Sequence, residues 1–469
     1  MSRVVETDSI GNNWVDFDLN KYNSFYFVGI GGISMSSLAI ILKRHGKTVK
    51  GYDRSRTNAT IAVEQEGIEV FYDTAPEHSE GVEVAVYTAA VTDTHPEMVI
   101  LKERGIPVLK RAELLGAIAK GYKNSVAVAG THGKSTTSGM LSHIFLADTE
   151  RDPTLLLGAK LPETGSAFRL GKDDDLIFEA CEYKDSFLSF YPTVAVLLNV
   201  CLDHTDYFEC LERMKQSFKR FVSNTDSRGA VVYNGDCSAA SECAESFGGR
   251  SYSFSVKDSS ADYFAEGVSF ENGLPSYNLC FKGQRLCRVK LSVPGNHNVE
   301  NSLAAFAAAH ISGISPETIA KGLADFKGVC RRFELRGELN GAPVYDDYAH
   351  HPDEIKATLA AAKKMGCKRV VSVFQPHTYS RLHDLFDDFA ASFGDSDFKI
   401  FTEVFSARET NVYGISSESL AGAVGGKFFA EFGELACYLK KEVREGDLLI
   451  FMGAGDINRA IPSVLNQPC

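Results

Sequence analysis

Residues 125–137 of this 469-residue chain read SVAVAGTHGKSTT, and this stretch decides the fold. A short apolar strand runs into a glycine-rich turn that begins at Gly130, and a helix is expected after the turn. In such a turn successive backbone N–H groups point inward, and the helix N-terminus adds its partial positive charge. Lys134 can reach the β- and γ-phosphates of a nucleotide, while the Ser135 hydroxyl is placed to bind Mg²⁺. The stretch therefore predicts a phosphate-binding loop in an α/β domain.

The loop departs from the full Walker pattern at one position, because Val128 stands where that pattern has its leading glycine. The alternative interpretation is a glycine-rich turn that binds no ligand. A strand before the turn, a helix after it and Gly-Lys-Ser at the junction favour phosphate binding over that alternative. The residues predicted to hold the nucleotide here are Gly130, Thr131, His132, Gly133, Lys134, Ser135 and Thr136.

Acidic and imidazole side chains follow two later strands of the same predicted sheet. The strand DLIFEA contains Glu179 near its end, and Glu182 comes soon after it. The strand VAVLLNV is followed by Asp203, His204 and Asp206. Because the carboxyl ends of parallel strands line one crevice, these groups are expected beside the phosphate loop, where they can bind one or two Mg²⁺. Any one of them alone would be interpreted as a solvated loop charge, but the cluster favours a functional role.

The segment SVPGNHNVENSLAAFAAA carries His297, Asn298 and Asn301 at the start of another helix. Simple N-capping of that helix is one explanation for polar residues at these positions. The amides can also bind the hydrogen-bonding edge of a base. The spacing alone leaves both interpretations open.

A second glycine-rich turn lies near the N-terminus. The strand SFYFV (residues 24–28) runs into GIGG, and the apolar helical face of Met35, Leu38, Ala39 and Leu42 follows. With Asp53 at the end of the next strand, this pattern resembles a nicotinamide dinucleotide fold. That fingerprint requires glycine at position 34, which is Ser34 here, so the signal is weak beside the downstream phosphate loop.

Strand and helix signals alternate in three successive units, which predicts three α/β domains with mainly parallel sheets. The first is Rossmann-like, the second is a P-loop ATPase-type domain with a β-rich insertion between about Gly229 and Val293, and the third is again Rossmann-like. A linker, GYKN, separates the first two. In the third unit, helices are expected at 353–364 and 381–393, and strands at 370–374, 399–404 and 447–452. The predicted boundaries are 1–122, 123–328 and 329–469.

Composition excludes several classes of protein. The net charge is −12, from 61 acidic and 49 basic side chains, which argues against nucleic acid as a partner. The eleven cysteines form no C-x-x-C pair, so reduced thiols are expected, not disulfides or a zinc site. The apolar stretches are too short for a membrane span, and residues 1–13 are too polar for a signal peptide. A cytoplasmic protein without membrane insertion is expected.

Nine motifs in order make the chain resemble the Mur ligases of peptidoglycan synthesis, from about Phe25 to Ile457. The resemblance implies a first domain for a UDP-sugar, a central ATPase and a third domain that receives an amino acid. Within the family, the H-x-Y-S-R spacing and the VGIGG start favour the member that adds alanine. The motifs are VGIGGISMS, GTHGKSTT, EACEYKDSF, NVCLDHTDY, GNHNVENSLAA, RRFE, DDYAHHPDE, FQPHTYSR and MGAGDI.

The resemblance also implies a reaction. The lactyl carboxylate of UDP-N-acetylmuramate attacks the γ-phosphate of ATP, and the amine of L-alanine then displaces phosphate from the acyl phosphate. The implied cofactor is Mg²⁺, with Mn²⁺ as an alternative, and the implied assembly is a monomer or homodimer. The alternatives are another Mur-type ligase that adds a different amino acid or peptide, and a non-ligase dinucleotide-binding protein.

The family's functional positions match particular residues of this chain. The implied metal-binding residues are Ser135, Glu182 and His204, and the implied catalytic residues are Lys134, His204, His350 and Arg381. The positions for ATP outside the phosphate loop are His297, Asn298, Asn301, Arg332 and Asp347. Tyr348, His377 and Arg381 match positions around the amino acid, and Gly29, Gly31, Gly32 and Asp53 those for the UDP-substrate.

Two residues depart from the family pattern. Cys181 stands where an aspartate is usual between the two glutamates, close to the expected metal. Thr378 stands where an arginine often follows the histidine of the FQPH segment. The first departure bears on the surroundings of the metal, and the second on the choice of amino acid.

Overall fold

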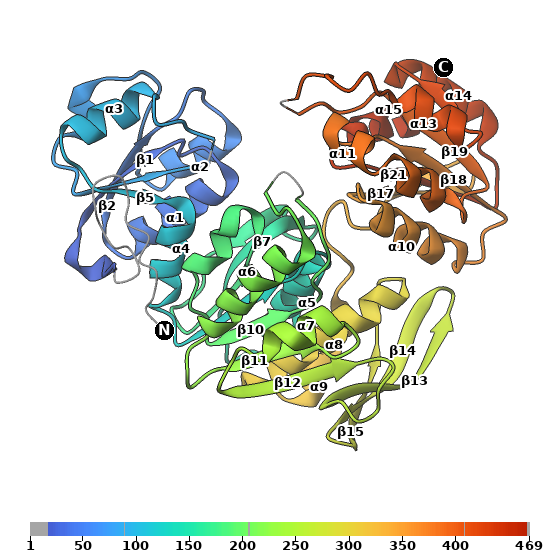
Figure 1. Ribbon diagram of the computed structural model, residues 1–469, viewed down its shortest axis with the longest axis horizontal. Helices are drawn as coiled ribbons and strands as arrows, with labels where there is room; N and C mark the ends of the chain where they lie inside the picture. Colours follow the sequence, from blue (N-terminus) through green and yellow to red (C-terminus); the bar gives the residue numbers. More distant parts are fainter. Residues whose placement is uncertain (1–16, 89, 205–206, 408, 467–469) are drawn as a thin grey trace.

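The computed structural model describes residues 17–88, 90–204, 207–407 and 409–466. It contains three sheets, each in a separate part of the sequence, with helices packed on their faces (Figure 1). The predicted fold class, three α/β domains on mainly parallel sheets, is confirmed. Among the described residues, no helix combines the length and the apolar character needed to cross a membrane. The polar segment 1–13 lies outside the described residues.

The N-terminal domain has a parallel five-stranded sheet in the order β3-β2-β1-β4-β5. The central strand β1 (Ser24–Val28) is buried from Phe25 onward, as its apolar sequence requires. Helix α1 (Ile33–Arg44) ends just before Gly46, whose φ of +80° is the left-handed conformation that glycine adopts freely. The other elements are β2 (Thr48–Tyr52), α2 (Asn58–Gln65), β3 (Glu69–Phe71), β4 (Val84–Tyr87), α3 (Pro96–Glu103), β5 (Val108–Lys110) and α4 (Arg111–Ala119).

The central domain has a ten-stranded sheet in the order β15-β14-β13-β12-β11-β10-β6-β9-β7-β8. The β-rich segment extends this sheet, because β12 pairs in parallel with β11 and leads into three antiparallel strands at the edge. The strands are β6 (Asn124–Ala129), β7 (Thr154–Leu161), β8 (Ser166–Arg169), β9 (Asp175–Glu179), β10 (Val194–Leu197), β11 (Ala230–Asn234), β12 (Arg250–Ser255), β13 (Tyr263–Glu271), β14 (Leu274–Phe281) and β15 (Gln284–Lys290). The helices are α5 (Lys134–Ala147), η4 (Tyr183–Ser189), α6 (Leu211–Ser223), α7 (Ser238–Ala244), α8 (Asn296–Ile311) and α9 (Pro316–Asp325).

The C-terminal domain has a six-stranded sheet in the order β16-β17-β21-β18-β19-β20, in which only β16 is antiparallel to its neighbour. The strands are β16 (Glu334–Leu339), β17 (Ala342–Asp347), β18 (Arg369–Phe374), β19 (Phe398–Thr402), β20 (Lys427–Phe429) and β21 (Asp447–Met452). The helices are α10 (Pro352–Lys363), α11 (Tyr379–Asp384), α12 (Phe386–Ala390), α13 (Ser417–Ala423), α14 (Phe432–Glu442) and α15 (Ala460–Asn466).

The single helix expected at 381–393 is wrong in detail. The backbone leaves the helical conformation at Leu385 (φ −117°, ψ 26°), so α11 and α12 are separate, and a 3₁₀ turn follows. Leu382, Phe389 and Phe393 are all buried at helical spacing. The periodicity of the apolar residues therefore survives the kink, which is why the sequence does not reveal it.

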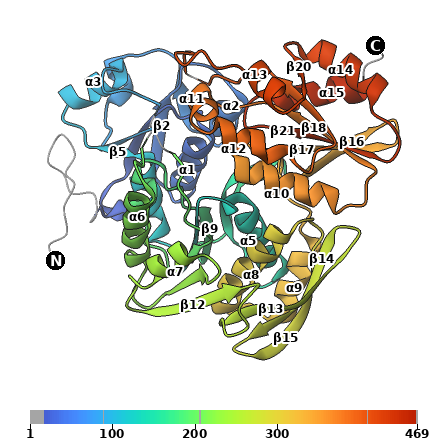
Figure 2. The ribbon, with the colours of Figure 1, turned by 45° about the vertical axis from the view of Figure 1, so that its right-hand side comes forward.

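Residues 326–333 join the central domain to the C-terminal domain. Gly328, Arg331 and Phe333 have positive φ values there (+105°, +60° and +51°), so the chain changes direction within a few residues. In two views the N-terminal and C-terminal domains both lie above the central domain (Figure 1, Figure 2). Helix α10 consequently faces the loops at the carboxyl end of the central sheet.

Candidate active site

The phosphate loop has the backbone geometry that its glycines predict. It joins β6 to α5, and Gly130 (φ +144°) and Gly133 (φ +87°) adopt conformations that other residues rarely do. A Cβ atom on Gly133 would lie 2.5 Å from Oδ1 of Asn301, which leaves no room for a side chain. Gly133 immediately precedes α5, so the helix begins at Lys134 with its free N–H groups directed at the loop.

The neighbouring strand β10 braces this loop. The His132 N–H donates to Oδ1 of Asn199 at 2.8 Å, and the Asn199 amide donates back to the His132 carbonyl at 3.1 Å. The Thr131 hydroxyl donates to the Cys201 carbonyl and accepts from the Cys201 N–H, both at 3.0 Å. The loop is therefore held in place by the residues after β10, and the Thr131 side chain has a bracing role.

The Lys134 ammonium lies over its own loop. Nζ donates to the carbonyls of Gly130 (2.5 Å) and Thr131 (3.0 Å) and contacts both carboxylate oxygens of Glu182 at 3.0–3.1 Å. Burial alone would lower the pKa of Lys134, but the adjacent Glu182 and Cys181 raise it. Burial would raise the pKa of Glu182, but Lys134 and His204 hold it below its usual range. The pair is therefore charged at neutral pH.

The three predicted metal-binding residues lie around the same loop, but they do not form a closed coordination sphere. The Ser135 hydroxyl donates to Oε2 of Glu179 at 3.1 Å, and His204 Nε2 lies 3.6 Å from Oε1 of Glu182. In the described ranges, no group of three or more His, Cys, Asp or Glu side chains is arranged to hold a metal. Asp206 lies outside the described residues.

The donor chemistry nevertheless fits a hard divalent cation. Oε2 of Glu182 is buried and accepts no well-aligned hydrogen bond, so this carboxylate has bonding capacity to spare. A carboxylate, a hydroxyl and an imidazole suit Mg²⁺ or Mn²⁺ when phosphate oxygens and water supply the remaining ligands. Glu179 has a different role, because it accepts hydrogen bonds from Ser135, Ser138 and the Gly158 N–H and so fixes the Ser135 side chain.

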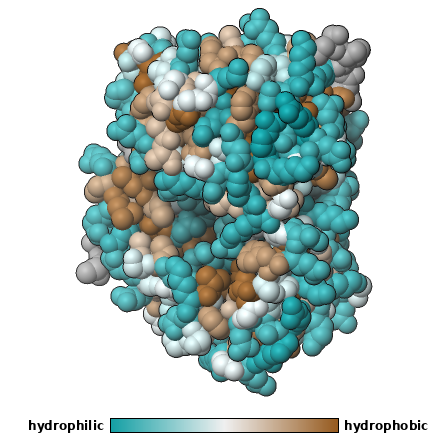
Figure 3. Space-filling view, turned by 90° about the vertical axis from the view of Figure 1, so that its right-hand side faces the viewer, coloured by the Kyte–Doolittle hydropathy of each residue, from teal (hydrophilic) through white to brown (hydrophobic). Residues whose placement is uncertain are grey.

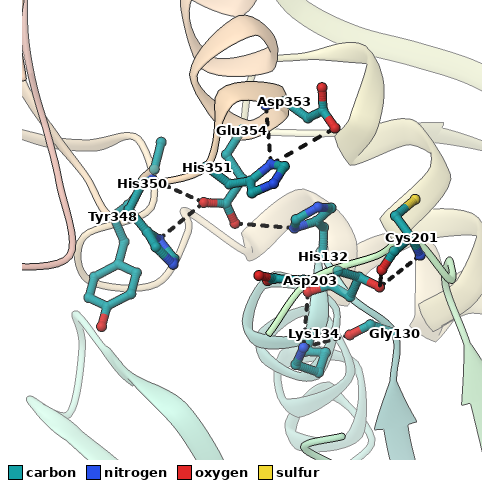
Figure 4. Close-up of polar contacts among 12 residues, drawn as sticks. Gly130, His132, Lys134, Cys201, Asp203, Tyr348, His350, His351, Asp353 and Glu354 are labelled. Carbon is teal, nitrogen blue, oxygen red and sulfur yellow. Dashed lines mark hydrogen bonds and ion pairs between the residues drawn. The ribbon is translucent and has the colours of Figure 1, made fainter. Parts of the chain in front are cut away.

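Glu354 of helix α10 connects the phosphate loop to the C-terminal domain. Its Oε1 lies 3.4 Å from Nδ1 of His132 and 3.6 Å from the Arg332 guanidinium, and its Oε2 lies 3.2 Å from Nδ1 of His350 (Figure 4). Oε2 also accepts the His350 N–H at 3.0 Å. Burial would raise the pKa of Glu354, but His350, His132 and Arg332 hold it well below its usual range.

A cavity of about 250 Å³ lies between the central and C-terminal domains, beside the loop. Seen from the side of the C-terminal domain, the molecular surface is hollowed between its upper and lower parts (Figure 3). One wall comes from the phosphate loop and helix α8, and the opposite wall from α10 and the end of β17. The lining includes His132, Gly133, Ser135, Thr136, Asn199, Val293, His297, Asn298, Glu300, Asn301, Arg332, Phe333, Asp347, Asp353, Glu354 and Thr358.

The predicted adenine segment forms part of this cavity. The Asn298 amide donates to the Pro294 carbonyl at 2.6 Å and Oδ1 of Asn298 accepts from Asn301 at 3.1 Å, so both amides are already engaged. Burial and the neighbouring Arg332 lower the pKa of His297 to about 4. A neutral imidazole in this position can exchange a hydrogen bond with a base without adding charge.

Arg332 and Asp347 mark the start of the C-terminal domain in the same cavity. The Asp347 carboxylate accepts the N–H groups of Phe333 and Ala349, both at 2.7 Å, and burial raises its pKa despite the nearby Arg332. The Arg332 guanidinium lies 5.2 Å from the centre of the Tyr348 ring. Asp347 therefore shapes the turn that carries Tyr348 and His350 toward the site.

The predicted amino-acid positions form a second group near the loop after β10. Arg381 donates to the His377 carbonyl at 2.8 Å and lies 3.7 Å from Oδ1 of Asp203 in the central domain. The His350 and His377 rings are 6.0 Å apart. Burial, together with His350 and Arg381, lowers the pKa of His377 to about 4. The Thr378 hydroxyl donates to Glu409 at 2.6 Å.

The glycine loop of the N-terminal domain is shaped by its neighbours. The Gly31 N–H donates to Oδ2 of Asp53 at 2.8 Å, and a Cβ atom on Gly31 would meet that same oxygen. A Cβ atom on Gly29 (φ +84°) would lie 2.9 Å from Thr88, whereas Gly32 has more room. Asp53 therefore holds the loop in shape.

Sequence comparisons place the whole chain in one family. Family models described as the Mur ligase family catalytic domain, the Mur ligase middle domain and the Mur ligase glutamate ligase domain match residues 24–123, 128–309 and 331–455. A protein of Caldicellulosiruptor saccharolyticus named UDP-N-acetylmuramate–L-alanine ligase is 41% identical over 451 residues, which are 95% of this chain and 99% of that protein. The chain belongs to the Mur ligase family.

Further relatives support this assignment. A protein of the same name from Acetivibrio thermocellus is 43% identical over 446 residues, covering 94% of this chain and 95% of that protein. Among solved structures, the UDP-N-acetylmuramate-alanine ligase of Thermotoga maritima has a TM-score of 0.77 at 27% identity, over 94% of this chain and 98% of that one. A murein peptide ligase from Psychrobacter arcticus shares the fold, with a TM-score of 0.68 at 23% identity. The Mur ligase resemblance predicted from the sequence is confirmed.

Several residues of this Mur ligase site were not assigned a role from the sequence. Glu354 lies inside the motif DDYAHHPDE, but nothing in the motif indicates that its carboxylate reaches the phosphate loop of another domain. Glu179 was expected beside the phosphate loop as a candidate Mg²⁺ ligand, but it holds the Ser135 side chain, and the bracing of the loop by Asn199 becomes visible only in the structure. Glu409 lies in a loop with no distinguishing pattern.

Proposed function

We propose that this Mur ligase joins L-alanine to the lactyl carboxylate of UDP-N-acetylmuramate at the expense of ATP. The observation that carries the proposal is the meeting of the phosphate loop with Glu354 and His350, which brings a nucleotide site and an amino-acid site together. The names of relatives that are about 40% identical over nearly the whole chain support the same substrates.

In the first proposed step, a lactyl carboxylate oxygen attacks the γ-phosphorus of ATP, the bond to the β-phosphate oxygen breaks, and ADP leaves. Two anions must approach each other, so a nearby cation is required. Lys134 is charged and can exchange its contacts with the loop carbonyls for phosphate oxygens. When bound by Ser135, Glu182 and His204, Mg²⁺ or Mn²⁺ would neutralise further charge on the phosphates.

In the second proposed step, the alanine amine attacks the acyl-phosphate carbonyl, an amide bond forms and phosphate leaves. Arg381 can bind the alanine carboxylate or the departing phosphate, because its guanidinium lies where the C-terminal domain reaches Asp203. His377 is unprotonated at neutral pH, so it can accept a hydrogen bond from the incoming amine. Tyr348 and His350 line the same approach.

The remaining assignments belong to the same proposal. The substrates are small molecules, with no role for nucleic acid, and the reaction requires the ATP of the cytoplasm. The assembly is proposed to be a monomer or homodimer. The second candidate function is a Mur ligase that adds a different amino acid or a peptide. It is kept because Thr378 replaces the more usual arginine, so one cation fewer is available for the amino-acid carboxylate.

The test is a panel of UDP-muramyl acceptors crossed with several amino acids, read as phosphate release and product mass. We expect phosphate from ATP only when UDP-N-acetylmuramate, L-alanine and Mg²⁺ are all present, with a product heavier by one alanine residue. A product with another amino acid or a peptide would establish the second candidate. Equal ATP turnover without either co-substrate would contradict both.

A further inference from the structure

The first residue of α4, Arg111, lies where the N-terminal domain meets the central domain. Helix α4 contacts both α1 of its own domain and η4 of the central domain. Figure 1 shows α4 directly above the central domain. At Gly116 the approach to the Ser189 carbonyl is so close that even a methyl group would not fit. The backbone of Arg111 is therefore held in place relative to both domains.

The Arg111 guanidinium has almost no partners. Among the residues that the structure describes, its one hydrogen bond runs from NH1 to the Ser34 hydroxyl at 3.1 Å. Within the ranges that the structure describes, it forms no ion pair, and its partial burial lowers its pKa. Keeping even a partly buried cation without a compensating anion is costly, and an anion bound beside it would offset that cost.

Ser34 explains part of this arrangement. It lies in the first turn of α1, directly after the loop of Gly29, Gly31 and Gly32, at the position where a dinucleotide fingerprint has glycine. A glycine there would remove the one hydrogen bond that the described residues offer the guanidinium. Because residue 34 is a serine and not the glycine of the dinucleotide pattern, the Arg111 guanidinium is held beside the glycine loop. That loop is the one expected to bind the diphosphate.

The other neighbour of Arg111 belongs to the phosphoryl-transfer site. Cys181 contributes to the electrostatic environment of the guanidinium, and the next residue is Glu182, the partner of Lys134. Arg111 thus lies between the N-terminal glycine loop and the ATP loop. A sugar nucleotide that extends from the glycine loop to the ATP loop would lie beside Arg111.

We propose that Arg111 binds an anionic oxygen group of the UDP-linked sugar acid, with Ser34 as the positioning residue that directs its guanidinium. This inference rests on the proposed function, since it concerns the same substrate. Two anionic groups of that substrate share the required chemistry, the diphosphate and the lactyl carboxylate. A planar guanidinium can bind either through two parallel hydrogen bonds.

The test uses the full-length enzyme with Mg²⁺ and a non-hydrolysable ATP analogue, and measures binding by calorimetry. The ligands are UDP-N-acetylmuramate and UDP-N-acetylglucosamine, which has the same nucleotide and sugar but lacks the lactyl group. For Arg111→Ala we expect UDP-N-acetylmuramate to bind roughly ten- to a hundredfold more weakly, as on loss of hydrogen bonds to a charged group. Arg111→Lys should recover only part of that loss, because an ammonium lacks the paired donors.

The two ligands separate the two sources of negative charge. Weaker binding of UDP-N-acetylmuramate alone would assign the carboxylate to Arg111, and weaker binding of both ligands would assign the diphosphate. Unchanged binding of both ligands by Arg111→Ala would overturn the inference. If the unmodified enzyme binds the ATP analogue but neither sugar nucleotide, the proposed function itself fails.

Two further variants distinguish a direct contact between Arg111 and the sugar nucleotide from a general disturbance of the N-terminal domain. Ser34→Ala should weaken binding less than Arg111→Ala, and adding it to Arg111→Ala should cause no further loss, because the hydroxyl acts only through the guanidinium. Arg104→Ala, at an exposed position after α3 in the same domain, is the matched control and should bind normally. Additive losses in the double variant would contradict the role of Ser34.

Discussion

Lys134 is held by acceptors that an arriving phosphate can replace. The Gly130 and Thr131 carbonyls and the Glu182 carboxylate surround the ammonium and satisfy its hydrogen-bonding capacity. Since the pKa of Lys134 is raised, the side chain carries its charge throughout the neutral range and serves as a cation, not as a base. We propose that it is already in place when charge develops on the transferring phosphoryl group.

Replacing Lys134 by alanine should lower kcat at least roughly a hundredfold, as expected when a charge that stabilises the transition state is lost. The variant also leaves Glu182 buried without its main counter-charge, so its melting temperature has to be measured beside its phosphate release. Lys123→Ala, which removes an exposed lysine from the start of β6, is the control. Near-normal turnover in a folded Lys134→Ala enzyme would refute the role assigned to Lys134.

Glu354 contributes stability that depends on pH. Its folded-state pKa is held well below its ordinary value, so the folded protein binds this proton less readily than the unfolded chain. The contribution is fully present above the unfolded-state pKa of about 4.3 and is lost as the pH falls through the folded-state value. Glu354→Gln should therefore cost about 2 kcal/mol at pH 7, because Arg332 loses its counter-charge and the contacts to His350 and His132 lose a charged acceptor.

The measurement is the melting temperature of both proteins between pH 7 and pH 3. The gap between them should narrow as the pH falls below about 4. A gap that stays constant over this range would show that the charge of Glu354 is not what stabilises the contact.

Helices and strands could be predicted from the sequence where their formation depends on residues that are neighbours in the chain. The strand, turn and helix around Gly130 follow from apolar residues, glycines and a Lys-Ser pair that lie next to one another. Strand β21 was predicted with its observed bounds, because Asp447–Met452 is a short apolar run buried on both faces. The kink at Leu385 is hidden because the apolar periodicity continues across it. The contact of Glu354 with His132 joins distant segments, which no local pattern encodes.

A substitution at Gly133 tests whether the phosphate loop needs the backbone conformation that glycine allows there. An alanine there would carry the cost of a left-handed backbone, about 1–2 kcal/mol, and its methyl group would overlap the Asn301 side chain. We expect Gly133→Ala to bind ATP at least about tenfold more weakly, as measured by calorimetry. Gly248→Ala is the control, because Gly248 has open space around it and no positive φ. Equal affinity in both variants would show that the loop adapts to a side chain.

Across the whole molecule, the site depends on contacts between domains. Asp203 follows the central strand β10, whereas Arg381 lies in α11 of the C-terminal domain, and 3.7 Å separates their charged groups. Burial would raise the pKa of Asp203, but His204 and Arg381 hold it below its usual range, so it is charged at neutral pH. The pair is placed to hold the two domains together while the reaction proceeds.

A double-mutant cycle can measure this coupling. Asp203→Asn and Arg381→Ala should each lower kcat, roughly tenfold or more, and the double variant should be little worse than Arg381→Ala alone. The measurement is steady-state phosphate release at saturating ATP, with the KM for alanine recorded for each variant. Multiplicative losses would mean that the two residues act independently and that their contact has no part in turnover.

The cavity between α8 and α10 has a further consequence. Because its two walls belong to separately built domains, the nucleotide chamber is complete only while those domains stay docked, and neither half encloses it alone. We therefore expect ADP release to require the two walls to separate, with residues 326–333 as the segment that can bend. A small compound that binds both walls at once should then slow turnover by keeping them together.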